Sequence, residues 1–184
     1  MTDLITKIEE YSLSDSDIRK VLGRNCKIIE YHELSNCRSL EELLPKPIDY
    51  IVILIEEQKD SGHWTALARQ HDLFLYFDPY GYVPDHDLAW IPMKARKLLG
   101  QSERYLTELI NKTDKDVRFN NIDYQSHNSS ISTCGSHVSC YLWHFMHKGM
   151  NLQDYYKEMV ELKRRTGLNF DAIVAKWIGR YISD

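Results

Sequence analysis

Apolar and polar positions divide the chain into a helical beginning, a central group of strands and a helical end. Residues 50–55 form an apolar run rich in β-branched side chains, which predicts a buried strand. Two further runs, at 63–68 and 73–77, predict strands joined by a tight turn. A weaker pattern at 117–124 predicts an edge strand.

Apolar residues at helical spacing predict helices on both sides of these strands. Segment 135–147 is apolar over much of its surface, so we expect this helix to run through the core. Because helices and strands are grouped rather than alternating, the pattern predicts an α+β fold with a small central mixed or antiparallel sheet. The remaining predicted helices span residues 15–22, 39–44, 94–111, 152–162 and 170–182.

The chain of 184 residues has the length of one domain. We predict a single domain over 1–184, with a helical N-terminal part (1–47), a core (48–148) and C-terminal helices (149–184). Hydrophobic residues make up 43% of the chain and charged residues 27%, which is the composition of a globular protein and excludes a disordered one.

The charge and the cysteine content of the chain limit which binding partners and which cellular compartment we expect. A net charge of −4 offers no general phosphate-binding surface, so we expect no DNA partner. No stretch reaches the roughly 18 apolar residues of a membrane span, and the N-terminus lacks the apolar core of a signal peptide. We therefore expect an intracellular protein whose four cysteines stay reduced and serve packing, metal binding or catalysis. We also expect the protein to be a monomer.

Four short segments carry side chains that suit a nucleophilic cysteine. Cys134 opens the predicted buried helix, where the helix dipole favours a thiolate over the thiol, which ordinarily titrates near ~8.5. His63 begins one strand and Asp78 ends the next, so pairing as a hairpin places both at one edge of the sheet. Asp78 would fix the tautomer of His63 and leave its other ring nitrogen for the thiol. The segments are Gly62-His63-Trp64, Phe77-Asp78-Pro79-Tyr80-Gly81, Tyr124-Gln125-Ser126 and Thr133-Cys134-Gly135-Ser136.

Other residues of these segments have supporting roles. Gly135 lets a substrate carbonyl approach the backbone N–H groups, and Gln125 offers a side-chain N–H donor to the same oxyanion. Gln125 lies nine residues before Cys134, and Asn128, six residues before it, is the alternative donor. Trp64 either shields the histidine from water, lines a substrate groove or packs in the core.

Weaker alternatives exist for several positions. Asp85 and Asp87 lie in a loop and are rivals of Asp78 as the partner of the histidine. The motif Cys134-x-x-His137-x-x-Cys140-x-x-x-His144 has zinc-like spacing. Ten residues of helix span roughly 15 Å, too far to gather around one ion, so we expect no metal and no cofactor. The basic run at 163–165 is expected to be a solvated helix end.

Together the four segments resemble the adenovirus-type maturation protease (adenain) and, more distantly, the SUMO-deconjugating proteases. The likeness rests on the Gly-His-Trp strand start, the Phe-Asp-Pro-Tyr-Gly turn, the upstream glutamine and the Cys-Gly before an apolar-aromatic helix, and it covers roughly residues 50–148. It implies a papain-like architecture in the permuted order His63, Asp78, Gln125, Cys134, with the nucleophile on the buried helix. The spacing between Gln125 and Cys134 is longer than is usual in that family.

The resemblance implies a cysteine endopeptidase that cleaves virion or capsid precursor proteins, often after small residues such as glycine. It also implies action in the host cytoplasm, in a virus factory or in the virion, because proteases of this kind occur in several DNA-virus lineages and in virophages. A peptide activator is compatible with the resemblance, whereas the charge of the chain does not support activation by DNA. Two alternatives remain open: removal of SUMO-like modifiers, and a non-catalytic scaffold or nucleic-acid-binding role.

Overall fold

The computed structural model describes residues 2–182, so residues 1, 183 and 184 of the predicted domain lie outside the described part. The described chain is α+β and forms two compact units that interleave along the sequence. The sheet unit contains residues 27–78 and 82–120. The helical unit contains residues 2–26, 79–81 and 121–182 of the described chain. The single domain and its three predicted divisions stay a prediction.

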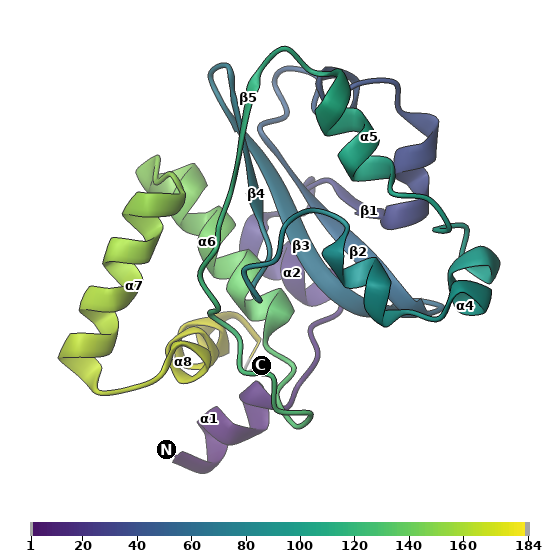
Figure 1. Cartoon of the computed structure of the whole chain (residues 1–184). Helices are drawn as coiled ribbons and strands as arrows, with labels where there is room; N and C mark the ends of the chain where they lie inside the picture. The colour runs from purple at the N-terminus through teal and green to yellow at the C-terminus, as the bar shows by residue number, and fades with distance from the viewer. Residues whose placement is uncertain (1, 183–184) are drawn as a thin grey trace. The chain divides into compact units, whose positions relative to one another are not determined.

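The sheet unit is built on five strands in the order β1-β2-β3-β4-β5 (Figure 1). β2, β3 and β4 pair antiparallel, whereas β1 is parallel to β2 and β5 is parallel to β4. The sheet is therefore mixed, which confirms the predicted fold class. The strands are β1 (Ile28–Glu30), β2 (Tyr50–Gln58), β3 (Ser61–Gln70), β4 (Leu73–Phe77) and β5 (Asp116–Phe119).

Helices of the sheet unit pack on one face of the sheet and form its core. Ile51, Ile53 and Ile55 alternate along β2 and share this core with side chains from the helical segments. The helical contribution includes Tyr31 and Leu106, both almost fully buried. The helical segments are η1 (Tyr31–Asn36), α3 (Leu40–Leu43), η2 (His86–Trp90), α4 (Met93–Leu98) and α5 (Tyr105–Lys112).

Two predictions in this unit are wrong in detail. The single helix at 94–111 is two helices, α4 and α5, because Gly100 adopts a left-handed φ of 68° and Gln101 bonds through its side chain to the backbone of Glu56. The edge strand at 117–124 ends at Phe119, because the next residue, Asn120, bonds through its side chain to Asp78. The short parallel strand β1 has no apolar alternation long enough to predict.

The helical unit is arranged around α6, in which eleven of fifteen residues are buried. This confirms the prediction of a buried helix at this position, and α6 packs against α2, α7 and α8. The predicted helix 15–22 is also confirmed, with a capping box between Ser14 and Asp17 that starts it. The helices of this unit are α1 (Thr2–Glu9), α2 (Asp15–Leu22), α6 (Cys134–Lys148), α7 (Leu152–Thr166) and α8 (Phe170–Ile182).

Within residues 2–182, none of the helices combines the length and the apolar character that spanning a lipid bilayer requires.

Candidate active site

In the sheet unit, a buried histidine and a buried aspartate are joined at the edge of the β3–β4 hairpin. Ala66 of β3 pairs with Phe77 of β4, so His63 and Asp78 extend beyond the same end of this ladder. The Nε2–H of His63 donates to Asp78 Oδ1 at 2.9 Å. His63 is 7% exposed and Asp78 is fully buried. This bond fixes the ring orientation and leaves Nδ1 as the nitrogen that can accept a proton.

The glycine before His63 is required by the close approach of β2. A Cβ atom at Gly62 would collide with the carbonyl oxygen of Ile55, which lies in the facing strand. A glycine is therefore required before His63 by packing alone, whatever the chemistry of the histidine. The close approach at Gly62 holds the start of β3 against β2 and so fixes the backbone from which His63 projects.

Asn120 holds the backbone of Asp78, a role that the sequence did not indicate. The Asp78 N–H donates to Asn120 Oδ1 at 2.9 Å, and Asn120 Nδ2 donates to the Asp78 carbonyl at 3.0 Å. The Asn120 N–H also donates to the Tyr76 carbonyl. The sequence carried no signal for this role, because the predicted strand at 117–124 runs through Asn120.

A second acidic side chain lies beside this pair. Ligand atoms of His63, Asp78 and Asp87 all lie within 4.8 Å of one another, and all three residues are buried. Burial raises the pKa of Asp87 to about 8, and a hydrogen bond with Asp78 acts in the same direction while His63 opposes it. Asp85, the other predicted rival, is used elsewhere, because it accepts from the Tyr31 hydroxyl and the Thr107 N–H.

In the helical unit, Cys134 is the first residue of α6 and is 6% exposed. Its sulfur therefore belongs to the first turn, where the helix dipole and free N–H groups favour negative charge. Gly135 is also buried in this turn. None of the four cysteines forms a disulfide.

The two candidate oxyanion donors differ in their surroundings. Gln125 is 3% exposed, and its backbone N–H donates to the Pro79 carbonyl. Its side-chain Oε1 is buried and has no hydrogen-bond partner among residues 2–182. Asn128 is exposed, and its side chain accepts from Ser130 within a local turn. The burial favours Gln125 as the residue with a functional side chain.

Asp171, from the first turn of α8, ties together the segments that carry Gln125 and Cys134. Its Oδ1 accepts from Thr133 Oγ1 at 2.5 Å and from His137 Nε2 at 3.0 Å. Its Oδ2 accepts from the Ser126 N–H at 2.9 Å. These contacts hold the residue after Gln125 and the residue before Cys134 on one carboxylate.

The charge state of Asp171 follows from these donors. Burial acts to raise its pKa, but the hydrogen bonds and the charge of His137, with Thr133 and Ser126, lower the pKa below its ordinary value. The sequence did not identify Asp171, because an acidic residue in a first helical turn is common and its partners lie 34 to 45 residues earlier.

Trp64 is 5% exposed in β3, opposite Leu54 of β2. A tryptophan buried to this degree packs in the interior of the protein. Its predicted role in substrate binding stays a prediction, as does that of Gly135.

The motif with zinc-like spacing serves other contacts. His137 bonds Asp171, whereas Cys140 lies 3.8 Å from His144 Nδ1, which also contacts the Cys140 carbonyl. Burial raises the pKa of Cys140 to about 12, so this thiol stays protonated.

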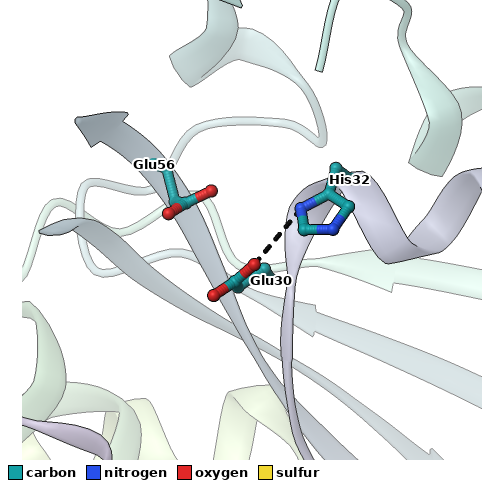
Figure 2. A group of neighbouring side chains, drawn as sticks. All are labelled: Glu30, His32 and Glu56. Carbon is teal, nitrogen blue, oxygen red and sulfur yellow. Dashed lines mark ion pairs between the residues drawn. The ribbon is translucent and has the colours of Figure 1, made fainter. Parts of the chain in front are cut away.

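Two groups of described residues have the separation of metal ligands. One is the His63–Asp78–Asp87 group, and the other is Glu30, His32 and Glu56 in the sheet unit (Figure 2). In the second group, Glu30 pairs with His32 Nδ1 at 3.3 Å, and Glu56 accepts from the Asp60 N–H at 2.8 Å. Burial and the nearby Glu56 raise the pKa of Glu30. Both carboxylates thus have structural partners in the hairpin and at the start of η1.

The fold and these contacts define an α+β protein with a buried histidine–aspartate pair and a cysteine at a helix start. No family model matches the chain. The chain is 31% identical to uncharacterized protein V9 of Sputnik virophage over 128 residues, which cover 69% of this chain and 73% of that protein. The chain belongs to the family of this virophage protein.

Solved structures with a similar course of the backbone were also found. The central domain of the uncharacterized Lpg1148 protein from Legionella pneumophila has a TM-score of 0.42 and 14% identity, with 94% of this chain and 99% of that chain covered. The ASFV pS273R protease has a TM-score of 0.41 and 15% identity, and the match covers 80% of this chain and 66% of that chain. The SUMO protease Ulp1, with its catalytic cysteine oxidized to a sulfinic acid, has a TM-score of 0.41 and 15% identity. The match covers 91% of this chain and 78% of that chain.

Proposed function

We propose that the chain is a cysteine endopeptidase in which Cys134 is the nucleophile and His63 its general base. The observation that supports this most is the buried bond from His63 Nε2 to Asp78 Oδ1, 2.9 Å long. A histidine held in this way has a defined tautomer with Nδ1 ready to accept a proton. The start of α6 supplies the second requirement, a thiol at a position that favours its anion.

The proposed reaction has two stages. His63 Nδ1 accepts the proton of Cys134 Sγ, and the thiolate attacks the substrate carbonyl carbon. Backbone N–H groups at the start of α6 and the Gln125 amide stabilise the oxyanion. The C–N bond breaks, and His63 delivers its proton to the leaving amine. Water then attacks the thioester, passes a proton to His63, and releases the acid while Cys134 regains its proton.

We further propose that the substrates are virion precursor proteins, cleaved after glycine or another small residue within the infected cell. The relationship to a virophage protein supports a viral setting. The resemblance of the four sequence segments to viral maturation proteases supports the substrate class.

Cleavage of a defined peptide mixture tests the proposal. The purified chain is incubated with a proteome-derived peptide library under reducing conditions, and new termini are identified by mass spectrometry. We expect cleavage after glycine or small residues by the wild type and none by Cys134→Ala. Equal cleavage by both proteins would contradict the proposal. Cleavage of a folded SUMO fusion without cleavage of peptides would instead establish modifier removal.

Asp78→Asn is expected to lower kcat/KM by about 10²–10⁴-fold, because an amide stabilises the wrong tautomer of His63 and no imidazolium. Asp123→Asn is the matched control, since Asp123 makes the same 2.9 Å contact with His127 but on the surface. The control should stay within about twofold of the wild type, as surface pairs contribute little. Steady-state kinetics on one cleaved peptide decide between these results.

A further inference from the structure

The acidic side chain beside the His63–Asp78 pair has no function in the mechanism above. Asp87 projects from η2, is 7% exposed, and lies with its carboxylate within 4.8 Å of the ligand atoms of both His63 and Asp78. Its Oδ2 is buried and receives no hydrogen bond from a described N–H or hydroxyl donor. Tyr76 of β4, a buried titratable group, interacts electrostatically with both Asp87 and Asp78.

Two carboxylates this close in a buried site do not both ionise, because their mutual repulsion is not screened by water. One of them therefore keeps a proton at neutral pH. The Nε2–H of His63 donates to Asp78, which stabilises the charged form of Asp78. The proton then resides on the carboxyl group of Asp87, which can donate it in a hydrogen bond to the carboxylate of Asp78.

We propose that Asp87 is a positioning residue that stays protonated at neutral pH and donates a hydrogen bond to Asp78. The bond holds the Asp78 carboxylate in the orientation that His63 requires. The kinetic consequences rest on the proposed function, whereas the protonation state of Asp87 does not. In agreement with the geometry, burial and the bond with Asp78 raise the pKa of Asp87 to about 8.

The pH dependence of stability follows from this raised pKa. In the unfolded chain Asp87 loses its proton near pH ~4, whereas in the folded chain it keeps the proton up to about pH 8. The contribution of Asp87 to stability is therefore full below the unfolded pKa, falls as pH rises between these values, and is constant above the higher one. Asp87→Asn removes this titration, so its advantage over the wild type should grow from about pH 4 to about pH 8.

The pH dependence of activity carries a second signature. Above about pH 8, ionised Asp87 adds a negative charge beside His63 and favours its imidazolium form. Asparagine cannot add this charge, so the alkaline limb of kcat/KM should begin at a lower pH in Asp87→Asn than in the wild type. Asp87→Ala, which lacks a donor, should lower kcat/KM at pH 6.5 by about tenfold or more, and Asp87→Asn should restore most of this loss.

The deciding measurement is a carboxyl titration by NMR on the full chain labelled with 13C-aspartate. The wild type and the control Asp72→Asn, whose side chain is 86% exposed, should both show one aspartate that titrates near pH 8. Asp87→Asn should lack this signal, and its thermal midpoint should rise relative to the wild type between pH 5 and pH 8.

A wild type in which every aspartate titrates below about pH 6 would overturn the proposal. So would a signal near pH 8 that persists in Asp87→Asn. Both readouts are independent of peptidase activity. If the NMR signal behaves as expected but no variant cleaves peptide, then the proposed function has failed and the proposal for the protonation of Asp87 stands.

Discussion

Replacing His63 with alanine is expected to lower kcat/KM by about 10²–10⁴-fold, the usual contribution of a positioned general base. The pH profile of the remaining activity should differ from that of the wild type, because proton transfer from Cys134 to an imidazole is lost. Steady-state kinetics between pH 5.5 and pH 9 measure both effects.

His147→Ala is the control for this prediction, since His147 is exposed in the last turn of α6. It should retain the wild-type pH profile. Because His63 is buried against Asp78, circular dichroism and the thermal midpoint must show that His63→Ala is folded at the assay temperature. A folded His63→Ala protein with the wild-type rate and pH profile would remove His63 from the mechanism.

Replacing Asp171 with alanine is expected to lower the free energy of unfolding by about 3 kcal/mol. The buried donors on Thr133 and His137 would lose their common acceptor, each at a cost of about 1–3 kcal/mol, and the part-buried N–H of Ser126 would lose its bond. Urea unfolding followed by circular dichroism measures the change.

Asp154→Ala is the matched control, because Asp154 also lies in the first turn of a helix, α7, but is exposed. Only the interaction of Asp154 with the helix dipole is lost, so we expect the free energy of unfolding to fall by at most about 1 kcal/mol.

The effect of Asp171→Ala on stability should depend on pH. Since the folded pKa of Asp171 is lowered, its contribution is present above the unfolded value and is lost as pH falls through the folded value. Equal effects of the two variants at pH 7 would show that the Asp171 contacts contribute little.

Strands β2, β3 and β4 could be predicted because their residues carry local signals. The apolar run of β2 and the turn before β4 lie in single short segments, and the structure has strands there. The end of the helix before Gly100 could not be predicted, since the apolar residues keep their helical spacing through this position. What ends the helix is a glycine conformation together with the bond from Gln101 to Glu56, a residue 45 positions earlier.

The candidate site shows the same division between local and distant information. His63 and Asp78 could be related in advance, because a hairpin brings a strand start beside the next strand end. Asn120 and Asp171 could not, since each is defined by contacts with elements far along the chain. Asp87 could be named only as a rival of Asp78, whereas the structure places it beside both Asp78 and His63. A sequence indicates which residues have suitable chemistry, whereas the groups that orient and protonate them depend on tertiary packing.

The pairing of Cys134 with His63 is tested most directly by the iodoacetamide labelling rate of each cysteine against pH, determined by peptide mapping. The other three thiols are internal standards, because burial raises the pKa of Cys26, Cys37 and Cys140. We expect Cys134 alone to label rapidly at pH 6 in the wild type and to lose this reactivity in His63→Ala. Labelling of Cys134 at pH 6 that is no faster than that of Cys37, or that is unchanged in His63→Ala, would contradict an activated thiolate paired with His63.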